Sequence, residues 1–308
     1  MPYDHRNTAR RTLALALAAT GCCAVLAGCG ASQAAPPSAK AQEARQSQQS
    51  PQAPETQGES GTQARPPLAS GPTRSRSPLP LSQSRSLVGR TVVIDPGHNS
   101  GNFRHSTEIN KKVNIGTTRK ECDTTGTSTN GGYTEASFTL DVSHRLRDLL
   151  TARGAKVILT HDGDRPWGPC IDERARIGNA ARADAVVSVH ADGSAVGNRG
   201  FHVILPARVR GGAADTAAIV GPSRALGERI ADRFARATGT NPANYLGGGT
   251  GLDVRDDLGG LNLSTVPKVF VECGNMRDPK DARLLTSSTW RQKAAQGIAD
   301  GIATYLKG

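Results

Sequence analysis

Apolar residues recur along residues 87–308 in two alternating patterns. Short apolar runs closed by turn residues predict buried strands at residues 91–94, 155–160, 184–190, 200–206 and 268–272. Between these runs, apolar residues spaced three and four apart predict helices at residues 135–153, 171–182, 223–238 and 288–306. Strands separated by helix-length segments favour the α/β class, here an αβα sandwich with a mainly parallel central sheet and helices on both faces.

Residues 29–86 follow neither pattern. They are rich in Pro, Gln, Ser and Ala and contain no aromatic residue. Such a stretch buries too little apolar surface to offset the entropy lost on ordering. It is predicted to be a disordered tether, and residues 87–308 are predicted to form one catalytic domain with its own core.

The first 28 residues are predicted to be a targeting signal. A basic stretch through Arg11 precedes the apolar residues 13–26, which are too few to span a bilayer that needs about 20. The motif Leu-Ala-Gly-Cys that ends at Cys29 resembles the lipobox of bacterial lipoproteins. That resemblance implies that Cys29 carries the lipid anchor, at the outer face of the cytoplasmic membrane. The alternative is an ordinary cleaved signal that happens to contain cysteines.

Charge and cysteine content agree with an exported protein. Lys and Arg number 38 against 27 Asp and Glu, a net charge of +11, but they are not clustered among aromatics as in nucleic-acid-binding proteins. Residues 87–308 keep 29 of the basic and 23 of the acidic residues, and such a modest positive charge favours residence beside an anionic cell envelope. Cys122 and Cys170 lie in predicted loops, and export would allow a disulfide between them. The sequence leaves open whether they are bonded.

Four side chains that could bind a metal ion or transfer a proton stand at the ends of predicted strands and helices. His98 follows the first predicted strand, His190 and Glu272 end two others, and Glu135 begins a helix. Because chemistry collects beyond the carboxyl ends of parallel strands, these groups are expected to converge. A catalytic zinc ion takes three His or carboxylate ligands, which would leave the fourth group free to act as a base.

Each of these side chains also has an ordinary structural interpretation. A histidine beside a buried strand is often a core residue, and Glu135 suits a helix start because of the helix dipole. Cys273 follows Glu272 on one strand, so alternation turns its thiol to the opposite face and predicts buried packing rather than metal ligation. Asp95 is a candidate for orienting a metal ligand, or a turn-forming Asp-Pro.

The remaining histidines carry weaker signals. His144 on a predicted helix and His161 in an acidic turn are both expected at the surface, while His105 and His202 are lesser candidates for substrate contact. The His-Glu-x-x-His helix, the Cys-x-x-Cys pair and the phosphate-binding loop are all absent from the sequence. The glycine run at 247–251 lacks phosphate-loop spacing and is predicted to be a plain loop.

The four sites lie in motifs that resemble a known family. Val-Ile-Asp-Pro-Gly-His ends at His98, Tyr-Thr-Glu ends at Glu135, Val-Ser-Val-His-Ala-Asp surrounds His190, and Val-Phe-Val-Glu-Cys-Gly surrounds Glu272. In this order, over about residues 90–308, they resemble the zinc-dependent N-acetylmuramoyl-L-alanine amidases of type 3, and most closely the single-domain actinobacterial enzymes.

The resemblance implies both an activity and a set of roles. His98, Glu135 and His190 would bind one Zn²⁺ per chain, and Glu272 would be the catalytic carboxylate. The reaction would be hydrolysis of the amide between N-acetylmuramic acid and the L-alanine of the peptidoglycan stem peptide. Partners would be peptidoglycan and, through the lipid, the membrane; no nucleic acid is expected, and a monomer is favoured.

The sequence departs from the family pattern at two places. Asn99-Ser100-Gly101 follows His98 where the family often has Gly-Gly, and Asn275-Met276 replaces a usual Gly-Phe. Both changes flank the predicted site without removing a zinc ligand, so they are expected to affect contacts with the substrate more than the binding of zinc. Two other functions compete with the amidase: a non-catalytic peptidoglycan-binding lipoprotein, which the retained Glu272 argues against, and a zinc peptidase that cuts within the stem peptide.

Overall fold

A computed structural model describes residues 86–308 of the protein. The predicted signal peptide 1–28, the predicted anchor Cys29 and the predicted tether through residue 85 lie outside the described residues. Within the part that is described, no helix combines the length and apolar character needed to cross a membrane.

Six strands form the central sheet. Their spatial order is β4 (Lys156–Leu159), β1 (Thr91–Pro96), β5 (Ala185–Asp192), β10 (Lys268–Asn275), β6 (His202–Pro206) and β9 (Leu252–Arg255). The first four strands are parallel, β6 is antiparallel to β10, and β9 is parallel to β6. The predicted mainly parallel sheet is confirmed. Strand β9 was not predicted, because four residues directly after a glycine run are too few to show a clear period.

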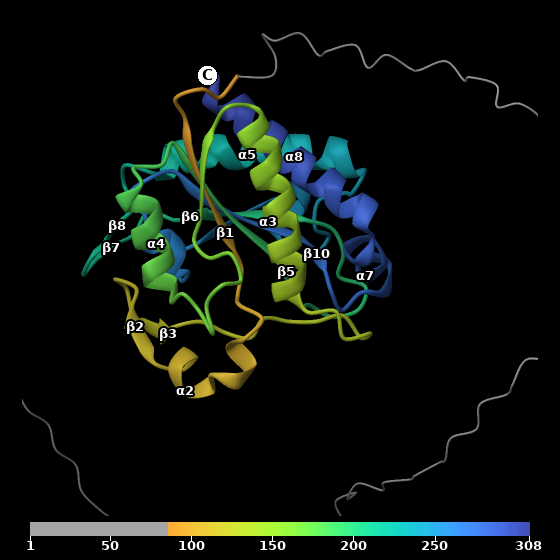
Figure 1. The fold of residues 1–308 in the computed structure, drawn as a ribbon, viewed down its shortest axis with the longest axis horizontal. Helices are drawn as coiled ribbons and strands as arrows, with labels where there is room; N and C mark the ends of the chain where they lie inside the picture. Colours follow the sequence, from red (N-terminus) through yellow and green to blue (C-terminus); the bar gives the residue numbers. More distant parts are fainter. Residues whose placement is uncertain (1–85) are drawn as a thin grey trace, which may run out of the picture. The chain divides into compact units, whose positions relative to one another are not determined.

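Helices cover both faces of this sheet. Helices α3 (Glu135–Ala152), α5 (Val220–Thr238) and α8 (Ser288–Leu306) lie on one face, where α8 packs against both α3 and α5 (Figure 1). On the other face, Ile177 of α4 (Ile171–Ala180) packs against β1 and β5. The two faces follow from strand alternation, since Val92 and Val93 enter different hydrophobic clusters.

Element ends differ slightly from the prediction. Helix α5 begins at Val220, ahead of Pro222, because a proline in the first turn sacrifices only an N–H that has no helical partner. The short helix α7 (Pro279–Thr286) was not predicted. The glycine run forms a 3-10 turn, η2 (Gly247–Gly249), which leads into β9.

Several short elements build the walls around one end of the sheet. After β1 come η1 (Asn102–Arg104), α2 (Ser106–Ile109) and the hairpin of β2 (Lys112–Asn114) and β3 (Arg119–Glu121). Figure 1 shows α2, β2 and β3 together below the sheet, in yellow. The remaining short elements are the β7 (Arg210–Gly211) and β8 (Ala214–Asp215) pair and α6 (Gly259–Asn262).

A covalent link fastens this end of the molecule. The sulfur atoms of Cys122, just after β3, and Cys170, at the start of α4, are bonded in the structure across 48 residues. The link joins the loop that follows the hairpin to the helix that covers the second face of the sheet. It therefore fixes the chain immediately before Asp123 and Thr124.

Candidate metal centre and active site

Three of the predicted residues meet at the carboxyl ends of the parallel strands. One donor atom each from His98, Glu135 and His190 lies within 4.8 Å of the other two, and no other such group of His, Cys, Asp or Glu occurs among residues 86–308. Glu135 stands between the imidazoles: Oε2 is 3.2 Å from Nε2 of His98, and Oε1 is 2.9 Å from Nδ1 of His190.

The loop after β3 sets the orientation of His98. Its Nδ1 lies 3.1 Å from the carbonyl oxygen of Thr124 and 3.5 Å from Oδ1 of Asp123, so Nε2 faces Glu135. Burial alone would lower the pKa of His98, but the carboxylates of Glu135 and Asp123 outweigh it and raise that pKa to about 10. Such surroundings stabilise positive charge at this point.

Glu135 is held by the start of α3. The side chain of Thr134 caps the helix by accepting a hydrogen bond from the backbone N–H of Ser137, which leaves Glu135 as the first helical residue. The backbone N–H of Thr127 donates to Oε2 at 2.9 Å. Burial raises the pKa of Glu135, yet His98 and His190 together hold it below its usual value. The carboxylate is therefore ionised and able to bind a cation.

Two glycines make room for the three side chains. A Cβ atom at Gly97 would lie 2.3 Å from the ring of His190, and one at Gly126 would lie 2.7 Å from His98 and 2.8 Å from Glu135. A residue with a side chain at either position would therefore force His98, Glu135 or His190 to move. On its other side, the ring of His190 stacks on Phe270, with centroids 5.2 Å apart.

Glu272 stands beside the three ligands but outside their contacts. It pairs with His190 in the register of β5 and β10, and strand alternation places it on the same face as Phe270. Its Oε2 atom is buried and has no hydrogen-bond partner among the described residues. Burial, followed by the charges of Glu135 and Asp192, raises the pKa of Glu272 well above its ordinary value. The position suits a group that exchanges a proton.

A buried ionic network lies beneath the site. Asp95, the candidate for orienting a ligand, accepts hydrogen bonds from four side chains and forms no hydrogen bond or ion pair with His98, Glu135 or His190. Its partners are Thr160, Arg174, Ser188 and Lys268. Arg174 extends the network, because its Nη2 donates to the carbonyl oxygen of His98 and to Asp123, each at 3.0 Å. Asp95 thus reaches His98 through Arg174.

Sequence reasoning missed the roles of Asp123, Arg174 and Lys268. Arg174 lies on a predicted helix, in the Glu-Arg-Ala-Arg segment at 173–176, where an arginine is usually at the surface. Asp123 follows a cysteine in a predicted loop and carried no signal of its own. Lys268 opens a predicted buried strand, and a lysine in that position was the available signal, because a lysine is rarely buried without an ionic partner; in the structure its side chain is fully buried.

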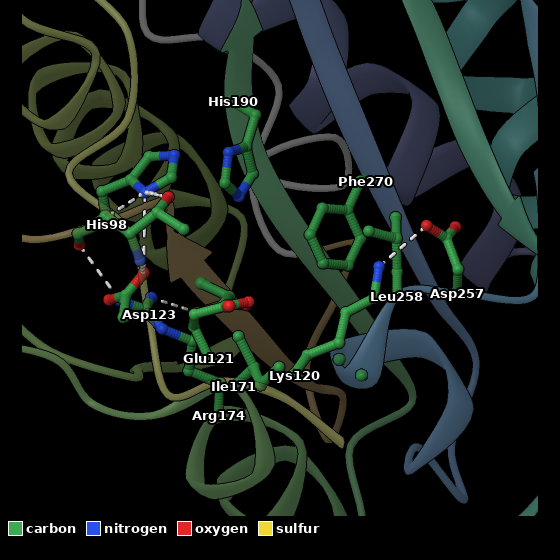
Figure 2. A pocket seen from close by; sticks show the side chains of 14 residues that line it. His98, Lys120, Glu121, Asp123, Ile171, Arg174, His190, Asp257, Leu258 and Phe270 are labelled. Atoms are coloured by element: carbon green, nitrogen blue, oxygen red, sulfur yellow. Dashed lines mark hydrogen bonds and ion pairs between the residues drawn. The ribbon is translucent and has the colours of Figure 1, made fainter. Parts of the chain in front are cut away.

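A cavity of about 280 Å³ opens beside the two imidazoles. Figure 2 shows His98 and His190 facing one another at one end of it, with Phe270 and Leu258 along the wall. Charged groups line the far side, where Nζ of Lys120 lies 2.9 Å from Oδ2 of Asp257. The cavity therefore offers an apolar wall and charges of both signs next to the candidate metal ligands.

The other histidines divide as follows. The expectation that His161 lies at the surface is wrong: it is buried, and its Nε2 donates to the carbonyl oxygen of Pro96 at 3.0 Å. His144 is partly exposed and pairs with Asp162. His202 is buried and opposes Glu272 across β6 and β10.

Two further expectations concern His105 and Cys273. His105 is partly exposed, with Nδ1 lying 3.7 Å from a carboxylate oxygen of Glu108. Cys273 is buried in the main hydrophobic cluster, which confirms the packing interpretation.

The donor set fits a catalytic metal ion. Two imidazoles and one carboxylate are the three protein ligands typical of a catalytic zinc site, and Glu272 supplies a separate carboxylate nearby. An α/β sheet that gathers these groups at the carboxyl ends of its strands is typical of a metal-dependent hydrolase.

Comparison with known proteins identifies the family. The family model described as N-acetylmuramoyl-L-alanine amidase matches residues 92–304, and the chain belongs to that family. An N-acetylmuramoyl-L-alanine amidase of Mycobacterium tuberculosis is 41% identical over 222 residues, which are 72% of this chain and 88% of the relative.

Two solved structures resemble the chain. The N-acetylmuramyl-L-alanine amidase of Mycobacterium smegmatis matches with a TM-score of 0.67 and 41% identity, covering 72% of this chain and 98% of its own. The apo form of the Mycobacterium abscessus enzyme matches with a TM-score of 0.66 and 42% identity, covering 71% and 100%.

Proposed function

We propose that the protein is a zinc-dependent N-acetylmuramoyl-L-alanine amidase that hydrolyses the amide between N-acetylmuramic acid and the L-alanine of the peptidoglycan stem peptide. The observation that carries this proposal is the convergence of His98, Glu135 and His190 with Glu272 beside them. The high identity to a mycobacterial amidase along most of both chains supports the choice of substrate.

His98, Glu135 and His190 would hold a single zinc ion. When bound there, zinc lowers the pKa of water and polarises a carbonyl group. Glu272 accepts the proton of the attacking water on its carboxylate and passes it to the nitrogen of the departing alanine. A carboxyl group whose pKa is raised by burial can hold that proton between the two transfers.

The surrounding residues keep this arrangement fixed. Arg174 donates to the backbone carbonyl of His98, and Asp123 lies next to its Nδ1 atom. Because His98 is held in place before the reaction, little reorganisation accompanies it. Phe270 excludes water from one side of His190. These contacts support an active enzyme over a binding protein, because a binding protein would have no use for a buried, unpartnered carboxylate at Glu272.

We further propose that the chain is exported and anchored by lipid. The signal peptide 1–28, Cys29 as the lipidated residue and a tether to residue 86 would place the catalytic domain at the outer face of the cytoplasmic membrane, within reach of peptidoglycan. The support is the sequence pattern of the first 29 residues. A monomer suits a site formed within a single chain.

The test is mass spectrometry of peptidoglycan fragments incubated with the wild type, Glu272→Gln and His98→Ala, with the zinc content of each protein measured in parallel. The wild type should release intact stem peptide from the sugar. Glu272→Gln should retain zinc and lose turnover, and His98→Ala should lose both. Fragments cut within the stem peptide would point to a peptidase, and wild-type protein that binds peptidoglycan without cleaving it would overturn the proposal.

A further inference from the structure

A second cavity adjoins the metal ligands and differs from the first in chemistry. Its volume is about 640 Å³, and no acidic or basic side chain lines it. Six side chains with hydroxyl groups do line it: Ser100, Thr125, Thr127, Ser128, Thr134 and Ser137. A hydroxyl both donates and accepts hydrogen bonds, so this wall, here called the hydroxyl groove, matches a ligand rich in hydroxyls and amides rather than in charge.

An exposed aromatic ring stands at the hydroxyl groove. Phe103 of η1 lines the groove and is 67% exposed, which is unusual for a large apolar side chain. The guanidinium carbon of Arg104 lies 4.8 Å from the centroid of the ring. An accessible ring next to hydroxyl and amide groups suits a sugar, because a pyranose has an apolar face of C–H groups and a polar edge.

The hydroxyl groove begins at the metal ligands. Gly126 lines the groove, and a Cβ atom there would touch both His98 and Glu135. Thr127, also in the lining, donates its backbone N–H to Glu135. The first cavity begins at His98 and His190, and the two cavities share no lining residue. The metal ligands therefore separate a charged cavity from an uncharged one.

The position of Glu272 assigns the two halves of the substrate. Glu272 lies two residues beyond Phe270 on the same face of β10, and it lies beside His190. Phe270 and His190 line the charged cavity. The group that protonates the departing amine must lie next to it, so the stem peptide leaves on that side. The acyl half, which carries the sugar, then extends to the opposite side of the metal ligands.

We propose that the hydroxyl groove binds the uncharged N-acetylated glycan strand of peptidoglycan, while the charged cavity with Lys120, Glu121 and Asp257 receives the stem peptide. This assignment rests on the proposed amidase function. It also gives a role to a departure from the family pattern, because Ser100, which stands in the segment where relatives often have Gly-Gly, lines the groove with its hydroxyl group. Phe103 is the residue on which the sugar stacks.

The first experiment measures saccharide binding without catalysis. A tetramer of N-acetylglucosamine, which has no peptide, is titrated into the full-length, zinc-bound wild type, Phe103→Ala and Phe103→Trp, with Kd determined by calorimetry or NMR. Phe103→Ala should weaken binding about tenfold, the upper end expected of one stacking contact, and Phe103→Trp should restore it. The matched control is Val88→Ala, an equally exposed apolar residue that precedes β1, and it should leave Kd unchanged.

The second experiment compares substrates that carry the same stem peptide on one sugar or on four. Wild-type kcat/KM should be higher for the longer glycan, and Phe103→Ala should reduce that advantage about tenfold with the same products formed. Normal cleavage by the wild type with no glycan preference and no effect of Phe103→Ala would overturn the groove assignment and leave the amidase standing. Saccharide binding that depends on Phe103, without any cleavage, would leave the groove and overturn the amidase.

Discussion

At the scale of single residues, the candidate metal site depends on the absence of a Cβ atom at Gly126. Gly126 has a φ of +72° and sits where a Cβ atom would press on two ligands at once. Gly132 has a φ of +85°, but no atom lies within 4 Å of the Cβ position there. The two glycines impose the same kind of backbone strain on alanine, and only one of them adjoins the ligands.

Gly126→Ala is therefore expected to weaken zinc binding about 10- to 100-fold, the range typical of disturbed ligand surroundings. Gly132→Ala should bind zinc as the wild type does. Competition with a chromogenic chelator measures both affinities. Equal affinities for the two variants would show that the close approach at Gly126 does not hold the ligands in place.

The buried carboxylate of Glu272 should lower the free energy of unfolding of the metal-free protein at neutral pH. Its pKa is raised from an ordinary 4.5 by burial and by Glu135 and Asp192, so the folded state favours the protonated form. The contribution of Glu272 to stability is then greatest below pH 4.5 and falls as the pH rises through the folded pKa. Glu272→Gln should raise the Tm of metal-free protein at pH 7 by a few degrees, and this gain should vanish below about pH 4.

Glu135→Gln is the control, with the opposite sign. The pKa of Glu135 is lowered by the two imidazoles, so its charge stabilises the folded state above the ordinary carboxyl pKa. This variant should lower the Tm at pH 7. Thermal unfolding across pH 3 to 8 in the presence of chelator distinguishes the two; the same direction of change for both would contradict the account.

At the scale of elements, the site depends on how α4 is attached to the sheet. Arg174 on α4 donates hydrogen bonds to Asp95 of β1, to Asp123 and to the backbone of His98. The side chains of Arg174, Asp95 and Asp123 are almost fully buried. Arg176, two residues later on the same helix, is 70% exposed in its side chain. One helix thus presents a buried and an exposed arginine for comparison.

Arg174→Met should lower the free energy of unfolding by about 3–5 kcal/mol, because it leaves the carboxylates of Asp95 and Asp123 without their cation. Arg176→Met should change it by less than about 0.5 kcal/mol, as is usual at the surface. Urea unfolding measures both. A small effect of Arg174→Met would mean that Lys268 alone balances the buried charge.

The bond between Cys122 and Cys170 serves the site as well as the fold. Closing a loop of 48 residues is worth about 4 kcal/mol in the chain-entropy treatment, and the link also anchors the chain before Asp123 and Thr124, which orient His98. Replacing both cysteines with alanine should lower the free energy of unfolding and speed zinc loss to chelator. Lower stability with an unchanged rate of zinc loss would limit the bond to a structural role.

The sequence predicted the long elements and the four central side chains because their signals are local. A buried apolar run or an amphipathic helix is visible within a short window, and His98, Glu135, His190 and Glu272 each stand at the end of one. What it missed depends on contacts distant in the chain. The burial of His161 follows from the carbonyl of Pro96, 65 residues away, and the short hairpin of β2 and β3 has too few residues to show a period.

At the scale of the whole molecule, the carboxyl end of the sheet brings two differently lined cavities together at the three proposed metal ligands. Charged Lys120 and Asp257 line one cavity, and hydroxyl side chains with Phe103 line the other. A substrate that joins a charged peptide to an uncharged glycan has the same division. In the proposed binding mode, the bond between its two halves lies at these three residues, beside Glu272.

Hydrolysis in water enriched in ¹⁸O tests this central claim most directly, because the label marks the carbonyl that was attacked. With a disaccharide bearing a stem peptide, the wild type should place one ¹⁸O atom in the lactyl carboxylate of muramic acid and none in the peptide. The zinc-bound Glu272→Gln variant should incorporate none in either product. Label in a carboxyl group of the stem peptide would contradict the account.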